Sequence, residues 1–136
     1  MPINNDEQFE EDVRNVANEL FPNSAAPEGR YAAGRERDGI FDDGDTVHIF
    51  EDTTSRKKEK IEDDISKSAA LVSDIRRERP GHNVKIWIVT SNPPTADQEQ
   101  AGINGRRKAR CPVEVISYAT LYSRLFNARH LIQQRW

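Results

Sequence analysis

The stretch KIWIVT, residues 85–90, restricts the fold of this chain more than any other feature. It is a continuous run with almost no polar alternation, bounded by Pro80-Gly81 before it and by SNPP after it. Such a run is typical of a strand that is covered on both faces of a sheet. VEVIS, residues 113–117, predicts a second short buried strand.

Helical signals surround these two strands. Apolar residues recur at three- and four-residue steps in three segments, and Thr95 to Gln98 matches a capping box that opens another helix. The helices predicted in this way cover about 6–21, 55–79 and 118–134, together with a segment from Thr95 that fades into a basic loop at 105–110. Helices interleaved with buried strands predict an α/β fold, with helices on both faces of a mixed sheet.

A β-hairpin is predicted in front of the long central helix. Residues 37–41 and 46–51 are β-rich and are separated by DDGD, in which Gly44 can adopt a positive φ. Period-two alternation places His48 on the surface, whereas Trp87 belongs to the core. The segment before the hairpin predicts a loop with room for one short strand near Tyr31.

The length and the residue content narrow the class of protein. A chain of 136 residues predicts one domain over 1–136. Cys111 is the single cysteine, which excludes an internal disulfide, and no cysteine–histidine spacing suits zinc. No apolar run approaches the roughly 20 residues of a membrane span. We therefore expect a soluble cytoplasmic protein with no membrane partner.

Charge is divided unevenly along the chain. Residues 1–55 carry a net charge of -10 and residues 56–136 a net charge of +7. This asymmetry suits carboxylates gathered around a cation, next to a basic surface for a polyanion; solvated helix faces are the alternative. The basic segment supplies four candidate contacts to a nucleic-acid backbone, or else a solvated loop: Arg106, Arg107, Lys108 and Arg110.

Asp38 and Glu51 are the candidate metal ligands. On a hairpin with a tight turn, the residue that enters one strand and the residue that leaves the other lie at the same open end. Two carboxylates held this close repel each other, unless a divalent cation such as Mg²⁺ or Mn²⁺ lies between them or one stays protonated. A cation at this position would support phosphodiester hydrolysis.

These residues resemble the PD-(D/E)xK motif of the restriction-endonuclease-like superfamily. Arg37-Asp38-Gly39-Ile40 corresponds to the first part of the motif and Glu51-Asp52-Thr53 to the second, with 12 residues between the two acids. The resemblance implies a restriction-endonuclease-like core and a Mg²⁺-dependent endonuclease. The chain departs from the motif at Thr53, where the family has a lysine.

The missing lysine is expected on the following helix, as in some members of the family. At about 100° per residue, Lys57 and Lys58 lie roughly 40° and 60° from the buried position Ile61, whereas Lys60 lies about 100° away. This favours Lys57 and Lys58 as the catalytic lysines and puts Lys60, with Asp64 and Lys67, on the flank.

The string HIFEDTTSRKKEKIEDDISK also resembles a bacterial branch that is fused to STAND or NACHT-type NTPases in anti-phage defence. The resemblance implies DNA as the substrate and a fused or associated NTPase module as partner. No recognition helix or base-reading loop is evident in the sequence, so we expect weak sequence specificity; homo-oligomerisation stays open. Two alternatives remain. One is an inactive nuclease fold that serves nucleic-acid binding or protein interaction, and the other is an adaptor that recruits proteins through its long helix.

Overall fold

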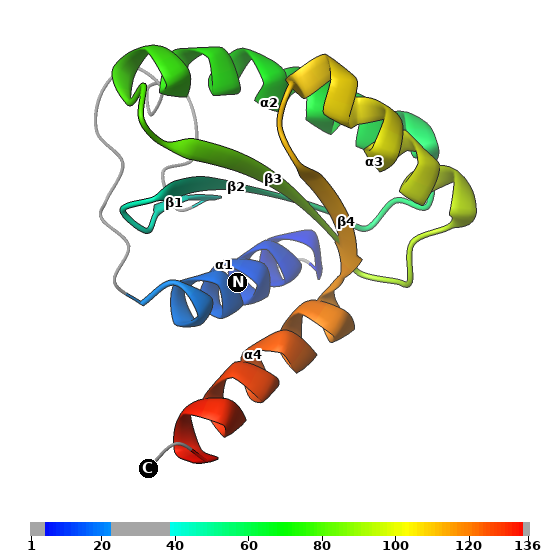
Figure 1. The fold of residues 1–136 in the computed structure, drawn as a ribbon. Coiled ribbons are helices and arrows are strands. Elements are labelled where there is room, and N and C mark those ends of the chain that lie inside the picture. The colour runs from blue at the N-terminus through cyan, green and yellow to red at the C-terminus, as the bar shows by residue number, and fades with distance from the viewer. Residues whose placement is uncertain (1–4, 23–38, 135–136) are drawn as a thin grey trace.

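The computed structural model describes residues 5–22 and 39–134, with side chains to residue 128, and shows three layers (Figure 1). The order of elements is α1 (Asn5–Leu20), β1 (Ile40–Asp42), β2 (Thr46–Thr53), α2 (Lys58–Glu78), β3 (Asn83–Thr90), α3 (Ala96–Ala109), β4 (Val113–Ser117) and α4 (Tyr118–Gln134). None of the described helices has the length and apolarity that a bilayer span requires. The strand expected near Tyr31 lies outside the described residues.

One mixed sheet forms the middle layer, with the strand order β1-β2-β3-β4. β1 pairs antiparallel with β2, and Ile40 lies opposite Ile49. β2, β3 and β4 run parallel, so Thr53, Thr90 and Ser117 meet at one end of the sheet. This confirms the predicted α/β class and the combination of a hairpin with parallel strands.

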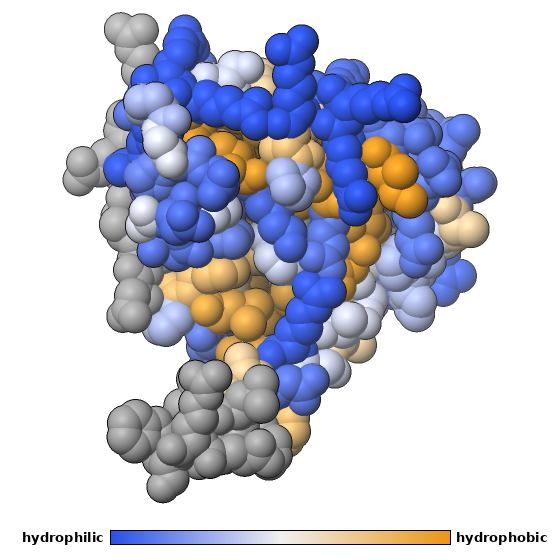
Figure 2. Space-filling model, viewed as in Figure 1, coloured by the Kyte–Doolittle hydropathy of each residue, from blue (hydrophilic) through white to orange (hydrophobic). Residues whose placement is uncertain are grey.

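Helices cover both faces of the sheet: α2 and α3 lie on one face, and α1 and α4 on the other (Figure 1). Alternate side chains of β3 enter the two cores: Ile86 and Ile88 pack on the α2 face, whereas Trp87 and Val89 pack on the α1 face. The prediction of a strand buried on both faces is thus confirmed. In Figure 2, hydrophilic residues (blue) cover α2 at the top, and hydrophobic residues (orange) show between α2 and α4.

The turn between β1 and β2 forms as its sequence predicts. Gly44 has a φ of 95°, a conformation that glycine adopts without the steric cost of a Cβ. The Asp43 carboxylate accepts the backbone N–H of Asp45 at 2.9 Å and that of Thr46 at 2.7 Å. Asp42 lies in β1, is 4% exposed, and pairs with Arg79 and His82, which joins the hairpin to the end of α2.

The basic segment 105–110 is not a loop, contrary to the prediction, because α3 continues to Ala109. The Asn104-Gly105 pair is typical of a helix break, but Gly105 instead provides space for packing. A Cβ at Gly105 would lie 2.4 Å from Ile65 Cδ1, and one at Gly102 would lie 2.5 Å from Val115 Cγ2. The two glycines therefore allow α3 to approach α2 and β4 closely.

The predicted surface position of His48 is also wrong, since its side chain is buried. The Phe21 ring stacks on the imidazole with ring centroids 4.0 Å apart. Trp87 Nε1 donates to His48 Nδ1 at 3.0 Å, and His48 Nε2 lies 3.0 Å from Asp43. Trp87 of β3 and Asp43 of the hairpin turn thus satisfy the two ring nitrogens, and Phe21 covers the ring. Alternation within the hairpin does not reveal Phe21 or Trp87.

Candidate active site around Glu51

Glu51 lies near the carboxyl end of β2, on the face covered by α2. Val47 and Ile49 precede it at two-residue steps and both pack in the core beneath α2, so alternation directs Glu51 to the same side. Ser68 of α2 confirms this placement, because its hydroxyl donates to Glu51 Oε1 at 3.4 Å. A rigid strand and the middle of a long helix therefore hold this carboxylate together.

Asp64, expected on the flank of the helix with no role in the site, is a buried acid on α2. It lies one turn before Ser68 and is 2% exposed. Its Oδ1 accepts a hydrogen bond from Lys60 Nζ at 2.8 Å, but its Oδ2 is buried and has no hydrogen-bond partner among the described residues. Leaving a buried acceptor without a partner costs about 1–3 kcal/mol, and more for a charged group. The fold therefore retains a carboxylate oxygen that does not contribute to its stability.

Lys60, Asp64 and Ser68 form a polar ridge along α2. Residues four apart lie on one side of a helix, so the three side chains follow one another toward Glu51. The hydrogen bond to Asp64 raises the pKa of Lys60, burial opposes it, and the charges of Asp64, Glu51 and Asp52 raise it further. Lys60 is thus a stable cation, which suits charge stabilisation and not proton abstraction.

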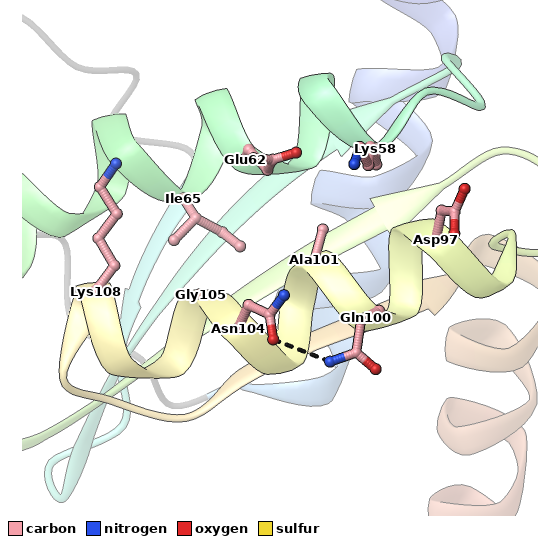
Figure 3. A pocket seen from close by; sticks show the side chains of 9 residues that line it. All are labelled: Lys58, Glu62, Ile65, Asp97, Gln100, Ala101, Asn104, Gly105 and Lys108. Carbon is pink, nitrogen blue, oxygen red and sulfur yellow. Dashed lines mark hydrogen bonds between the residues drawn. The ribbon is translucent and has the colours of Figure 1, made fainter.

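The two lysines expected to lean toward Glu51 lie elsewhere. Lys58 lines a groove of about 260 Å³ between α2 and α3, together with Asp97 and Lys108 (Figure 3). Lys57 is exposed at the N-cap of α2, and its carbonyl accepts a hydrogen bond from Gln98. The expected geometry is therefore wrong for Lys58, because α2 packs on α3 as well as on the sheet and its buried side has two neighbours. The catalytic roles of Lys57 and Lys58 stay predictions.

Thr53, where the resemblance implies a lysine, has a local structural role. It is 5% exposed, and its hydroxyl accepts the backbone N–H of Ser55 at 3.1 Å. The Ser55 hydroxyl in turn accepts the backbone N–H of Lys57 at 3.1 Å. These two bonds turn the chain from β2 into α2, so the helix begins at Lys58 and not at Ser55 as predicted.

The four basic residues at the end of α3 point to different surroundings. Arg106 donates to the Val113 carbonyl at 3.3 Å, and Lys108 donates to Ser66 Oγ at 2.7 Å. Arg107 is exposed, and Arg110 caps the helix in the left-handed conformation. All four residues are exposed, and the helix distributes their charges around its axis. Their contact with nucleic acid stays a prediction.

The metal site itself is only partly described. Asp38 lies outside the described residues, and within residues 5–22 and 39–134 no three His, Cys, Asp or Glu side chains are grouped for metal binding. Cys111 is buried as expected, and burial raises the pKa of its thiol. No protein-family model, curated protein or solved structure matches this chain.

Proposed function

We propose that this chain is a Mg²⁺-dependent endonuclease that hydrolyses DNA with little sequence specificity. The observation that carries the proposal is the buried Asp64 carboxylate. One of its oxygens lacks a partner among the described residues, and it lies on the same helix ridge that contacts Glu51. A fold retains such an oxygen at a cost when a ligand uses it.

The donor set fits a hard divalent cation. Glu51 and Asp64 offer carboxylate oxygens, which are the ligands that Mg²⁺ and Mn²⁺ prefer. β1 begins at Ile40, which lies opposite Ile49, and Asp38 precedes the described residues of this hairpin by one position. Asp38 and Glu51 are the proposed metal ligands, and Asp64 is a candidate for a third. A bound cation would polarise the phosphate and lower the pKa of an attacking water.

The remaining residues of the ridge have separate roles in this proposal. Protonated Lys60 offsets negative charge on the phosphate, the role that a lysine at position 53 has in the family. Ser68 orients the Glu51 carboxylate. Arg106, Arg107, Lys108 and Arg110 are proposed contacts to the DNA backbone, and a role in anti-phage defence with an NTPase partner is part of the same proposal.

Plasmid nicking tests the proposal. Asp38→Asn and Glu51→Gln are each expected to abolish nicking that needs Mg²⁺ or Mn²⁺ and that EDTA stops. Glu59→Gln, an exposed acid in the first turn of α2, is the matched control and should retain wild-type nicking. Nicking by Glu51→Gln at the wild-type rate would rule out the site.

A lysine series locates the positive charge. Lys57→Ala, Lys58→Ala and Lys60→Ala are compared in the same assay, and we expect the largest loss from Lys60→Ala because its charge interacts with Glu51. A loss of nicking only in Lys57→Ala or Lys58→Ala would instead support Lys57 or Lys58 as the catalytic lysine, as the helix geometry predicts.

An inactive nuclease fold that binds nucleic acid or protein is the second candidate. It is favoured by Thr53, whose hydroxyl is engaged with Ser55 in place of a lysine. Isothermal titration with Mn²⁺ separates the two functions. The nuclease should bind the ion through Glu51 and lose the binding in Glu51→Gln, whereas an inactive module need not bind it.

A further inference from the structure

A basic hollow lies at the end of the sheet opposite Glu51. Its volume is about 420 Å³, within the range of small-molecule sites. It reaches from the amino ends of β2 and β3 to the carboxyl ends of α2 and α3. Thr46 lines it, and Glu51 lies five residues further along β2, roughly 17 Å away at about 3.4 Å per residue. The hollow is therefore separate from the candidate active site.

The lining of the hollow is positively charged. Arg76, Lys85 and Arg110 contribute permanent cations, His48 and His82 contribute imidazoles, and no lining residue is acidic. Lys85 pairs with Glu114 at 2.8 Å outside the lining. Within the described part of the chain, neither Arg76 nor Arg110 forms an ion pair with a carboxylate.

The two arginines are held next to each other. An Arg76 Nη donates to the backbone carbonyl of Arg110, which joins the last turn of α2 to the end of α3. Helix dipoles favour cations at these two ends. The helix dipoles explain why arginines occur at these two ends, but they do not explain why both arginines border one hollow whose lining has no carboxylate. Two arginines that border one hollow, with no carboxylate partner among the described residues, suit a multiply charged oxyanion, because guanidinium forks match phosphate geometry.

We propose that this hollow binds a phosphoryl group, carried by a phosphorylated small molecule or by a nucleic-acid backbone. The proposal gives Arg110 a role that does not depend on the proposed nuclease site.

Phosphate titration of ¹⁵N-labelled protein tests the proposal, with sodium chloride at equal ionic strength as the reference. We expect saturable shifts of the Asn83 and Cys111 amides, which border the hollow, and no shift at Thr53. Absence of saturable shifts, or shifts centred on Thr53, would overturn the proposal.

Arg110→Asn removes one cation while keeping a residue that tolerates the left-handed conformation at φ 58°. It should weaken phosphate binding about tenfold, as expected for one lost charge-assisted hydrogen bond. Lys67→Gln removes an exposed charge of α2 outside the hollow and should leave binding unchanged. Equal weakening of phosphate binding by both variants would mean that binding depends only on the net charge of the protein, and it would refute the site.

Two further measurements identify the ligand and separate this proposal from the nuclease. Tighter binding of pyrophosphate than of a short single-stranded oligonucleotide indicates a small phosphorylated ligand, and the reverse order indicates a backbone phosphate; binding of neither contradicts the site. Glu51→Gln should bind phosphate like the wild type, and loss of phosphate binding in Glu51→Gln would show that the anion is held elsewhere.

Discussion

The Lys60–Asp64 pair allows the cost of a functional carboxylate to be measured directly. We consider Lys60→Ala, Asp64→Ala and the double variant, in EDTA so that metal makes no contribution. Asp64 is 2% exposed, whereas the Lys60 side chain is 40% exposed. Because only one partner is deeply buried, we expect the two single substitutions to have unequal effects on the free energy of unfolding.

Removal of Lys60 leaves a buried carboxylate without its cation. Breaking a fully buried pair in this way costs about 3–5 kcal/mol, and the exposure of Lys60 reduces our expectation to roughly 2 kcal/mol. Removal of Asp64 loses the same hydrogen bond, but it also removes an unsatisfied acceptor that costs about 1–3 kcal/mol. Asp64→Ala should therefore stay within about 1 kcal/mol of the wild type. The double variant should resemble Asp64→Ala.

Urea denaturation followed by far-ultraviolet circular dichroism measures these differences. With a denaturant slope of about 2 kcal/mol per molar, Lys60→Ala should shift the midpoint by about 1 M. Asp64→Ala that destabilises more than Lys60→Ala would refute the reasoning, because Asp64 would then be a structural residue with all its partners.

Added Mg²⁺ connects the same measurement to function. An ion at tenfold its dissociation constant stabilises the folded state by about 1.4 kcal/mol. If Asp64 contributes a metal ligand, Asp64→Ala should lose most of this gain while keeping its stability in EDTA. An equal gain in both proteins would exclude Asp64 from the metal site.

Three further predictions concern the surrounding fold. Burial tends to raise the pKa of Glu114, but hydrogen bonds from Arg124 and Lys85 outweigh it and hold the pKa below 4.5. The stability that Glu114 contributes is therefore present above pH 4.5 and is lost as the pH falls through the lowered pKa. Glu114→Gln should remove this part of the pH dependence of the free energy of unfolding. Gly105→Ala should destabilise by about 1 kcal/mol, because overpacking of about 1–3 kcal/mol exceeds a helix-propensity gain of about 1 kcal/mol, whereas Gly81→Ala, with open space around it, should not. Adding Ile65→Val to Gly105→Ala removes the closest clashing atom and should recover part of the loss in thermal denaturation; no recovery would place the strain elsewhere.

Much of the architecture could be predicted from periodicity and local signals. The apolar run of β3, the capping box at Thr95 and the DDGD turn with its positive-φ Gly44 are all observed. These features depend on residues close in sequence, or on burial so complete that the pattern is unambiguous. The restriction-endonuclease-like assignment, the metal and the substrate depend instead on a short motif, and they stay proposals.

Local patterns failed where a distant segment set the environment. Gly105 has the sequence of a helix break, but Ile65 of α2 requires its missing Cβ. His48 alternates outward within the hairpin, but Phe21, just after α1, and Trp87 of β3 bury it. At both positions the partners lie 27 to 40 residues away along the chain, and they come close only when the layers of the fold assemble.

The candidate site divides in the same way. By itself the sequence marks Glu51 as an acid at the end of a strand, since strand ends and turns can be recognised locally. Four-residue spacing aligns Lys60, Asp64 and Ser68 on one side of α2. Only the tertiary structure directs this side toward Glu51 and leaves Lys58 facing α3. The physical reason is that helical periodicity tells which residues are buried but not which neighbour buries them, and the packing of α2 between the sheet and α3 decides this.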